Sequence, residues 1–157
     1  MRIGFGYDIH PFEENRPLII GGVTIPFEKG LKGHSDADVL AHAVADALLG
    51  AAALGDIGEH FPDTDEKYKN YDSMLILQEV ERKIYFKKFK IVNIDISLVL
   101  QKPKISPYKE QIVNNIASNL FIKPVQVNVK ATTGEGLGFV GRSEGAVCYA
   151  VALLKPR

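Results

Sequence analysis

The sequence predicts an α+β fold in which helices cover one face of a mixed β-sheet. Three observations favour this class. Residues 89–101 alternate apolar and polar side chains, as a half-buried strand does. Residues 38–53 and 73–86 are rich in residues with high helix propensity. The predicted elements follow the order β, hairpin, α, α, β, α, β, β without a repeat or linker, so we expect one domain over residues 1–157.

The chain opens with a predicted strand over residues 2–10, in which Gly4 and Gly6 indicate a close backbone approach or a bulge. A hairpin follows over residues 17–27, where two short β-rich runs flank a Gly-Gly pair. Polar, glycine-containing residues 29–36 read as a loop.

The first helix is predicted over residues 38–53, ending near Gly55. Residues 55–70 carry several breakers and acidic side chains and are expected to form a loop. The second helix follows, with Asp72 or Ser73 placed to cap it.

The third helix, over residues 106–120, is expected to use Ser106 as its N-cap, because Pro107 suits the first helical position. Residues 125–131 alternate with a period of two and predict a strand. Residues 144–155 form an apolar run that we interpret as a buried strand.

Composition excludes several classes of protein. Nineteen acidic and nineteen basic residues give a net charge of zero, which argues against a nucleic-acid binder. A single cysteine excludes an intrachain disulfide and fits a reducing compartment. No apolar run reaches the roughly 18 residues of a membrane span, and the N-terminus lacks the apolar stretch of a signal peptide. We therefore expect a soluble, cytoplasmic protein.

The predicted sheet is apolar on both faces, although the helices cover only one. The apolar strand positions that suggest this are Val92, Ile94, Ile96 and Leu98 against Ile91, Val99 and Val151. A second copy of the chain is the simplest cover for the other face, so we expect an oligomer.

Three residues predict a zinc site. Asp8 and His10 are two apart on a strand and share one face, and His42 comes from the first helix. Two imidazoles and one carboxylate leave a fourth tetrahedral position open for substrate, as in catalytic zinc sites. The alternative is that the three are unrelated polar residues.

On the first helix, Asp38, His42 and Asp46 are spaced four apart and line one face. We expect Asp38 or Asp46 to accept the second ring proton of a ligating histidine. The alternative is a solvated helix face.

Two loops carry further polar groups. His34, Ser35 and Asp36 precede the first helix and suit phosphate recognition. Residues 61–65, with two carboxylates, either bind the hydroxyls of a polyol or cap turns.

The glycine-rich residues 131–139 follow a strand. Their exposed amides, with Thr132 and Thr133, suit a diphosphate, and Glu135 suits a hard divalent cation. Residues 100–106 end another strand at a proline, leaving backbone groups free to read a base edge.

Together, RIGFGYDIH, GHSDADVLAHAVADALLGAAALGDIG, HFPDTD, VNVKATTGEGLGF and GRSEG closely resemble the 2-C-methyl-D-erythritol 2,4-cyclodiphosphate synthases of the non-mevalonate isoprenoid pathway. The resemblance extends from residue 2 to residue 154. It implies a homotrimer with each active site between two subunits, and the open face of the sheet packed inside that trimer.

The resemblance also implies roles for individual residues. Zn²⁺ is expected on Asp8, His10 and His42, and Mg²⁺ or Mn²⁺ on Glu135. His34 and Thr133 are expected to stabilise developing charge. The implied substrate-binding residues are Asp8, Ile9, His10, His34, Ser35, Asp56, Ile57, Gly58, Phe61, Pro62, Asp63, Thr64, Asp65, Leu100, Gln101, Lys102, Pro103, Lys104, Ile105, Ser106, Ala131, Thr132, Thr133, Gly134, Glu135, Phe139 and Arg142.

The sequence departs modestly from the family. Gly134 replaces a frequent threonine, and Gly136 adds a second glycine to the loop. Near the implied threefold axis, Arg142 needs an opposing charge, from Glu144 or from an anion such as an isoprenoid diphosphate.

The implied reaction is a metal-assisted cyclisation of 4-diphosphocytidyl-2-C-methyl-D-erythritol 2-phosphate that releases CMP. Two alternatives stay open at this point. One is a metal-dependent phosphohydrolase with the same ligands, in which Asp46 or Asp65 activates water. The other is a trimeric module that binds nucleotides or isoprenoid diphosphates without turnover.

Overall fold

The computed structural model describes residues 1–157 and confirms the α+β class with a mixed sheet. Five strands lie in the order β4-β1-β7-β5-β6, and only the β5–β6 pair is parallel. Their bounds are β1 Arg2–Glu14, β4 Lys29–Leu31, β5 Phe89–Val99, β6 Val127–Thr132 and β7 Gly145–Pro156. The predicted hairpin is present as β2 (Leu18–Ile20) and β3 (Val23–Ile25).

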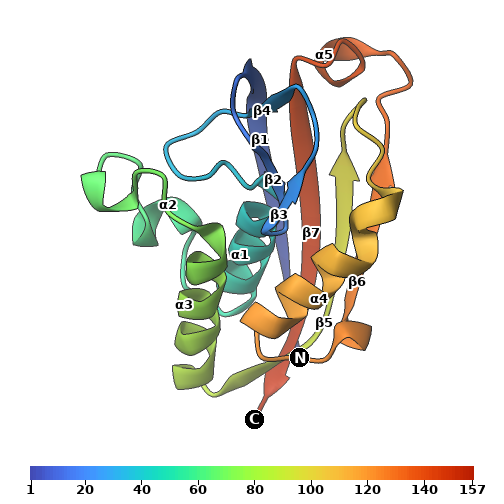
Figure 1. The fold of residues 1–157 in the computed structure, drawn as a ribbon. Helices are drawn as coiled ribbons and strands as arrows, with labels where there is room; N and C mark the ends of the chain where they lie inside the picture. Colours follow the sequence, from blue (N-terminus) through green and yellow to red (C-terminus); the bar gives the residue numbers. More distant parts are fainter.

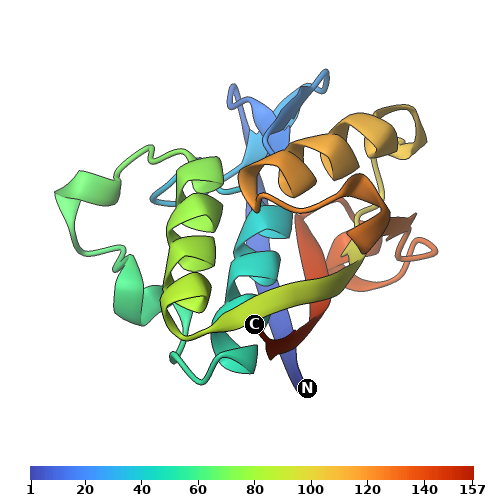
Figure 2. The same ribbon diagram turned by 90° about the horizontal axis from the view of Figure 1, so that it is seen from below.

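The helices lie on one side of this sheet (Figures 1 and 2). Helix α1 (Val39–Ala51) packs against β1 and β7, and α3 (Ser73–Phe86) packs against α1. Helix α4 (Lys109–Asn119) covers β6. The core is the layer between sheet and helices, and none of these helices is long and apolar enough to cross a membrane.

Gly4 and Gly6 mark a close approach, as the sequence predicts. A Cβ on Gly6 would lie 1.9 Å from the carbonyl oxygen of Ala43, and one on Gly4 would lie 1.8 Å from that of Ala47. The backbone of β1 therefore touches the backbone of α1, which sets the depth of His42 relative to the strand.

Two predicted loops contain regular structure. Within 29–36, β4 pairs with the far end of β1, which extends to Glu14. Within 55–70 lie the single-turn helix α2 (Ile57–His60) and a 3₁₀ turn at Glu66–Tyr68. Strand β4 forms by pairing with a segment distant in sequence, and each of the two short turns needs only one capping aspartate. Neither kind of element produces a periodic pattern in the sequence.

The predicted cap of the third helix is wrong. Residues Ser106–Tyr108 form a 3₁₀ turn, α4 begins at Lys109, and no side chain caps either element. Similarly, Pro124–Gln126 form a 3₁₀ turn, so β6 begins two residues later than expected. In both places proline initiates a tight turn before the regular element.

A bulge in β5 changes the predicted distribution of apolar residues. The register shifts between Ile91 and Asn93, so Ile91 and Ile94 are both buried on the helix side, against the strict alternation expected. Ile96 and Leu98 are buried with them.

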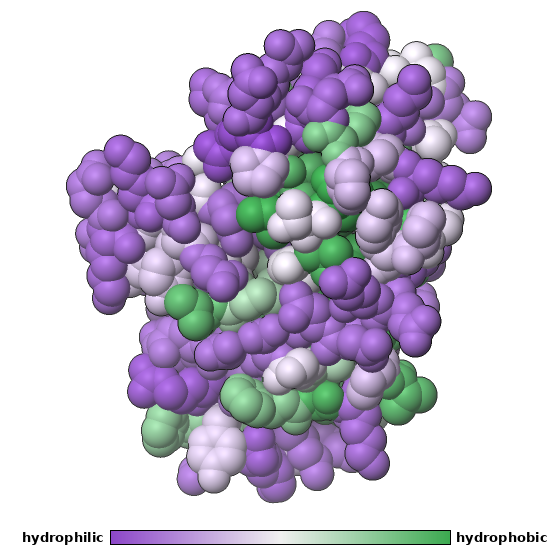
Figure 3. Space-filling model, in the orientation of Figure 1, coloured by the Kyte–Doolittle hydropathy of each residue, from purple (hydrophilic) through white to green (hydrophobic).

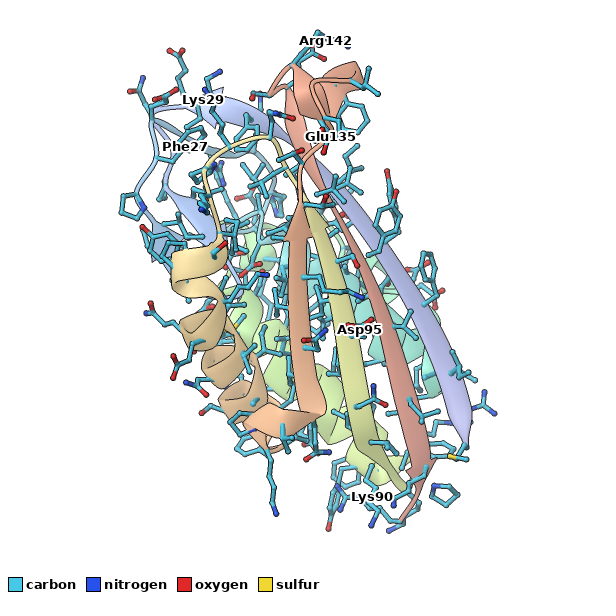
Figure 4. The ribbon with its side chains drawn as sticks, turned by 90° about the vertical axis from the view of Figure 1, so that its right-hand side faces the viewer. Phe27, Lys29, Lys90, Asp95, Glu135 and Arg142 are labelled. Carbon is cyan, nitrogen blue, oxygen red and sulfur yellow. The ribbon has the colours of Figure 1, made fainter.

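The open face of the sheet is nevertheless apolar over β1 and β7. Its exposed large side chains are Ile3, Phe5, Tyr7, Ile9, Tyr149 and Val151. Over β5 and β6 the same face is polar, with Asp95 contacting Asn128 and Lys130 (Figure 4). By contrast, the side seen in Figure 1 is mostly hydrophilic, with only smaller apolar areas (Figure 3).

Candidate metal and substrate site

Strand β1 and helix α1 bring the three predicted metal ligands together. Alternation along β1 turns Asp8 and His10 toward α1, where the buried His42 meets them. Asp8 Oδ2 lies 2.9 Å from His10 Nε2 and 3.0 Å from His42 Nδ1. The two ring nitrogens are 3.3 Å apart, so the alternative of unrelated polar residues is wrong.

These three atoms suit a tetrahedral metal ion. Zinc bonds of about 2.0–2.1 Å would separate neighbouring ligand atoms by about 3.4 Å, close to the separations here. His10 Nδ1 lies 3.0 Å from the carbonyl oxygen of Lys32, which accepts its N–H, so a neutral His10 would have its lone pair on Nε2, available to a metal ion. The donor set therefore fits a cation, and two imidazoles with a carboxylate favour zinc.

Neither Asp38 nor Asp46 is the partner of His42 that the sequence predicts. Asp38 is buried and caps α1, accepting N–H bonds from Gly21, Gly22 and Ala41. Asp46 accepts the N–H of Ile57. The helix face is thus not solvated, and its two aspartates hold the β2–β3 hairpin and α2 against α1.

The second ring nitrogen of His42 instead faces two hydroxyls. Nε2 lies 2.8 Å from Ser73 Oγ and 3.2 Å from Ser35 Oγ. The sequence suggested Ser73 only as a helix cap. No local signal indicates this contact, because it joins residues from two different helices.

Asp8 and His42 of the triad, and Asp46 on the same helix as His42, have shifted pKa values. Burial alone would raise the pKa of Asp8, but the hydrogen bonds and positive charge of His42 and His10 outweigh it and lower the pKa to about 2. Burial opposes protonation of His42, yet the hydrogen bond and charge of Asp8 raise its pKa. The pKa of Asp46 is raised by burial.

A cavity of about 410 Å³ opens beside the triad. It collects the triad and most of the residues predicted to surround the substrate, namely His34, Ser35, Ile57, Gly58, Phe61, Pro62 and Asp63. It also includes Gly33, Tyr68 and Ile76, which sequence reasoning missed because each belongs to a segment expected to be only a loop or a core helix.

Of the predicted substrate-binding residues between Asp8 and Asp65, four lie outside this cavity. Ile9 points to the opposite face of β1 from Asp8 and His10. Asp56 caps α2, and Asp65 caps the following 3₁₀ turn, as the turn-cap alternative proposed. Thr64 lies in the exposed turn just before that 3₁₀ turn.

A second cavity, of about 420 Å³, is lined by the predicted cytidine segment and the end of β6. Its residues are Leu100, Gln101, Lys102, Pro103, Lys104, Ile105, Ser106, Ala131, Thr132 and Thr133. It shares no residue with the cavity at the triad. Within one chain, the predicted site is therefore divided into two halves.

The glycine-rich loop is less open than the sequence suggests. Two of its amides, from Gly134 and Gly136, each lie 3.3 Å from Gln101 Oε1 and donate to it. Glu135 between them has a φ of +53°, and its side chain is exposed. Gln101 thus links the cytidine segment to the predicted second metal ligand.

Arg142 lies at the same end of the sheet as Glu135 (Figure 4). Its Nε is 2.8 Å from Glu144 Oε1, so Glu144, one of the two opposing charges expected for Arg142, pairs with it within one chain. Phe139, in the single-turn helix α5 (Gly138–Gly141), is 39% exposed and contributes to neither cavity.

Comparison with known proteins agrees with this geometry. The model of the YgbB family matches residues 1–155. The chain belongs to this family. A 2-C-methyl-D-erythritol 2,4-cyclodiphosphate synthase of Desulfatibacillum aliphaticivorans is 61% identical over 99% of this chain and 100% of its own length. The synthase of Clostridium novyi is 56% identical over the full length of both. The resemblance inferred from the motifs is confirmed.

Solved structures show the same fold. The bifunctional IspDF of Campylobacter jejuni is 49% identical with a TM-score of 0.96, and the match covers 99% of this chain but 42% of that one. A CDP complex of IspF from Plasmodium falciparum is 38% identical with a TM-score of 0.88, covering 99% and 96%.

Proposed function

We propose that this YgbB-family chain is a 2-C-methyl-D-erythritol 2,4-cyclodiphosphate synthase, with residues 1–157 acting as one catalytic domain. The observation that carries the proposal is the convergence of Asp8, His10 and His42 within 3.3 Å at the edge of a substrate-sized cavity. The synthases at 56–61% identity over essentially the whole chain support it.

The substrate of this reaction, 4-diphosphocytidyl-2-C-methyl-D-erythritol 2-phosphate, carries its own nucleophile. An oxygen of its 2-phosphate bonds to the β-phosphorus, the bond from that phosphorus to the α–β bridging oxygen breaks, and CMP leaves with the electron pair. The protein therefore needs no activated serine or cysteine. Its tasks are to fold the substrate back on itself and to neutralise charge.

The two cavities divide these tasks. The cavity at the triad receives the methylerythritol and its 2-phosphate, with His34 and Ser35 as donors. The other cavity receives cytidine, whose base edge meets the backbone of residues 100–106. Thr133, the residue that follows β6, stabilises charge on the diphosphate together with His34.

Bound metal ions would supply charge neutralisation. A zinc ion held by Asp8, His10 and His42 would provide a Lewis acid for the β-phosphate, and Mg²⁺ or Mn²⁺ at Glu135 would shield the diphosphate oxygens. Glu135 suits the second role because its exposed carboxylate is an oxygen ligand, and because Gln101 of the cytidine cavity bonds the amides on either side of it.

We further propose a homotrimer in which each site joins the triad half of one subunit to the cytidine half of its neighbour. Two observations support it. The two cavities share no residue, and the open face of β1 and β7 carries the apolar side chains that an interface buries.

The decisive experiment incubates the pure protein with this substrate and a divalent ion and follows the products by phosphorus NMR. We expect equal amounts of CMP and a cyclic diphosphate, with no solvent ¹⁸O in the product. Linear, ¹⁸O-labelled products would instead establish the phosphohydrolase alternative. Binding without turnover that survives His10→Ala and His42→Ala would establish the nucleotide-binding alternative.

A further inference from the structure

The hydroxyl of Ser73 lies behind the metal triad, where the proposed reaction gives it no role. Ser73 is the first residue of α3 and is completely buried. Its Oγ is 2.8 Å from His42 Nε2, the ring nitrogen that points away from Asp8. The role of this hydroxyl depends on whether Ser73 Oγ or His42 Nε2 donates the proton of the hydrogen bond between them.

Asp36 settles the direction of this hydrogen bond. Its carboxylate accepts the O–H of Ser73 at Oδ1 and the backbone N–H of Ser73 at Oδ2, 2.8 Å away. The N–H of Asp38 also donates to Oδ1, at 3.1 Å. An ionised carboxylate only accepts, so the single proton of the Ser73 hydroxyl is committed to Asp36. Ser73 Oγ can then only accept from His42.

We propose that Ser73, held by Asp36, is a positioning residue for the metal site. By accepting the Nε2 proton of His42, Ser73 keeps that proton on the ring when Nδ1 loses its own on metal binding, so that the neutral ring carries its lone pair on Nδ1. That lone pair points at Asp8 and His10, where the proposed cation binds. The inference rests on the proposed metal site and adds the group that prepares one of its ligands.

Helix capping does not explain the Ser73 hydroxyl. The N-cap of α3 is Asp72, whose side chain accepts the N–H of Met74 at 2.8 Å. The backbone N–H of Ser73 is bonded to Asp36 independently of the hydroxyl. Ser73→Ala therefore removes the contact to His42 while leaving the cap and the backbone tie in place.

Ser35 is the weaker of the two partners of His42. Its Oγ is 3.2 Å from Nε2, accepts the N–H of Ala37 at 3.3 Å, and lines the substrate cavity. No carboxylate fixes the direction of its proton. The Ser35 hydroxyl remains free to turn toward the substrate, whereas that of Ser73 does not.

The test measures the zinc dissociation constant of the full-length protein by competition with a chelator, without substrate. We expect Ser73→Ala to weaken zinc binding roughly 10- to 100-fold and to change the visible spectrum of the Co²⁺-loaded protein. Ser73→Thr, which keeps the hydroxyl, should restore binding. Ser118→Ala, at an exposed serine of α4, is the matched control and should bind zinc as the wild type does.

A second measurement needs no variant. In the zinc-loaded wild type, NMR of the imidazole nitrogens should show His42 protonated at Nε2, with that proton protected from exchange. Zinc affinity within twofold of wild type in Ser73→Ala, or an unprotonated Nε2, would overturn the role of Ser73 alone. A wild type that binds neither zinc nor Co²⁺ would overturn the proposed metal site and this inference with it.

Discussion

Each histidine of the triad is fixed at the nitrogen that faces away from Asp8. The carbonyl of Lys32 holds His10, and Ser73 with Ser35 holds His42. The elements that carry these residues are held by the sheet and by the packing of α1, independently of any ion. Removing one ligand should therefore empty the site without unfolding the protein.

Asp8→Ala, His10→Ala and His42→Ala should each lose bound zinc and nearly all CMP release. Elemental analysis and sedimentation of the purified variants test this, with an unchanged assembly expected. His60→Ala is a matched control, because His60 bonds the carbonyl of Leu54 outside the triad cavity and should keep full zinc content. Full zinc occupancy in His42→Ala would show that the site is misassigned.

At the scale of elements, the contact between β1 and α1 positions the site. The two glycines of β1 let the strand backbone touch the helix, and Asp38 ties the start of the helix to the β2–β3 hairpin. The strand–helix contact and the Asp38 carboxylate are both buried and tightly packed, so small changes in side-chain volume or charge there should alter stability.

Gly6→Ala should destabilise the protein by roughly 3 kcal/mol or more, because its Cβ would overlap the backbone of α1. Gly50→Ala provides the contrast. Gly50 lies in α1 with nothing within 4 Å of an added Cβ, so helix propensity should stabilise the protein by about 0.5–1 kcal/mol. Urea unfolding measures both changes, and equal effects at the two positions would contradict this account of the interface.

Asp38 should make stability depend on pH. Burial and the charge of Asp36 raise its pKa from 3.8 to about 6 in the folded protein. Between these values the folded state binds a proton that the unfolded chain has released. The contribution of Asp38 to the free energy of unfolding is therefore complete below about pH 4 and lost as the pH rises through 6, by roughly 2–3 kcal/mol. Urea unfolding from pH 4 to 7 should give a flatter curve for Asp38→Asn than for wild type, and parallel curves would refute the shift.

At the scale of the whole molecule, one chain holds two half-sites and one uncovered apolar sheet face. An assembly through that face would bury its apolar side chains. It would also complete each site if the triad half of one subunit meets the cytidine half of the next. Sedimentation should then give a mass near three times 17.3 kDa. A fully active monomer at low concentration would refute the trimer and the shared site together.

Mixed trimers test the shared site directly. His42→Ala and Thr133→Ala proteins should each be inactive, since each damages a different half-site. When the two are unfolded and refolded together, each mixed trimer regains one intact site, so random mixing should recover about a quarter of wild-type activity. Mass spectrometry of differently tagged chains confirms that mixing occurred. Mixed trimers without activity would place the whole site within one chain.

Local periodicity in the sequence is enough to predict several individual elements. Alternation in residues 89–101 and helix propensity in 38–53 and 73–86 predicted β5, α1 and α3 closely. The spacing of Asp8 and His10 placed both on one face of β1. Gly4 and Gly6 predicted that another backbone approaches β1 closely. These predictions succeed because each depends on residues within one element.

Which distant residues come into contact depends on how the elements pack against one another. The irregular pairing of β5 with β7 at Ile91, the pairing of β4 with β1, the bonds of Asp38 to the hairpin and the contact of Ser73 with His42 all join segments far apart along the chain. Gln101 reaches the glycine-rich loop in the same way. The sequence shows which hydrogen bonds a polar side chain can make, but not its partner. Packing sets the partner, because a buried polar group must bond to one of the groups that folding brings within reach.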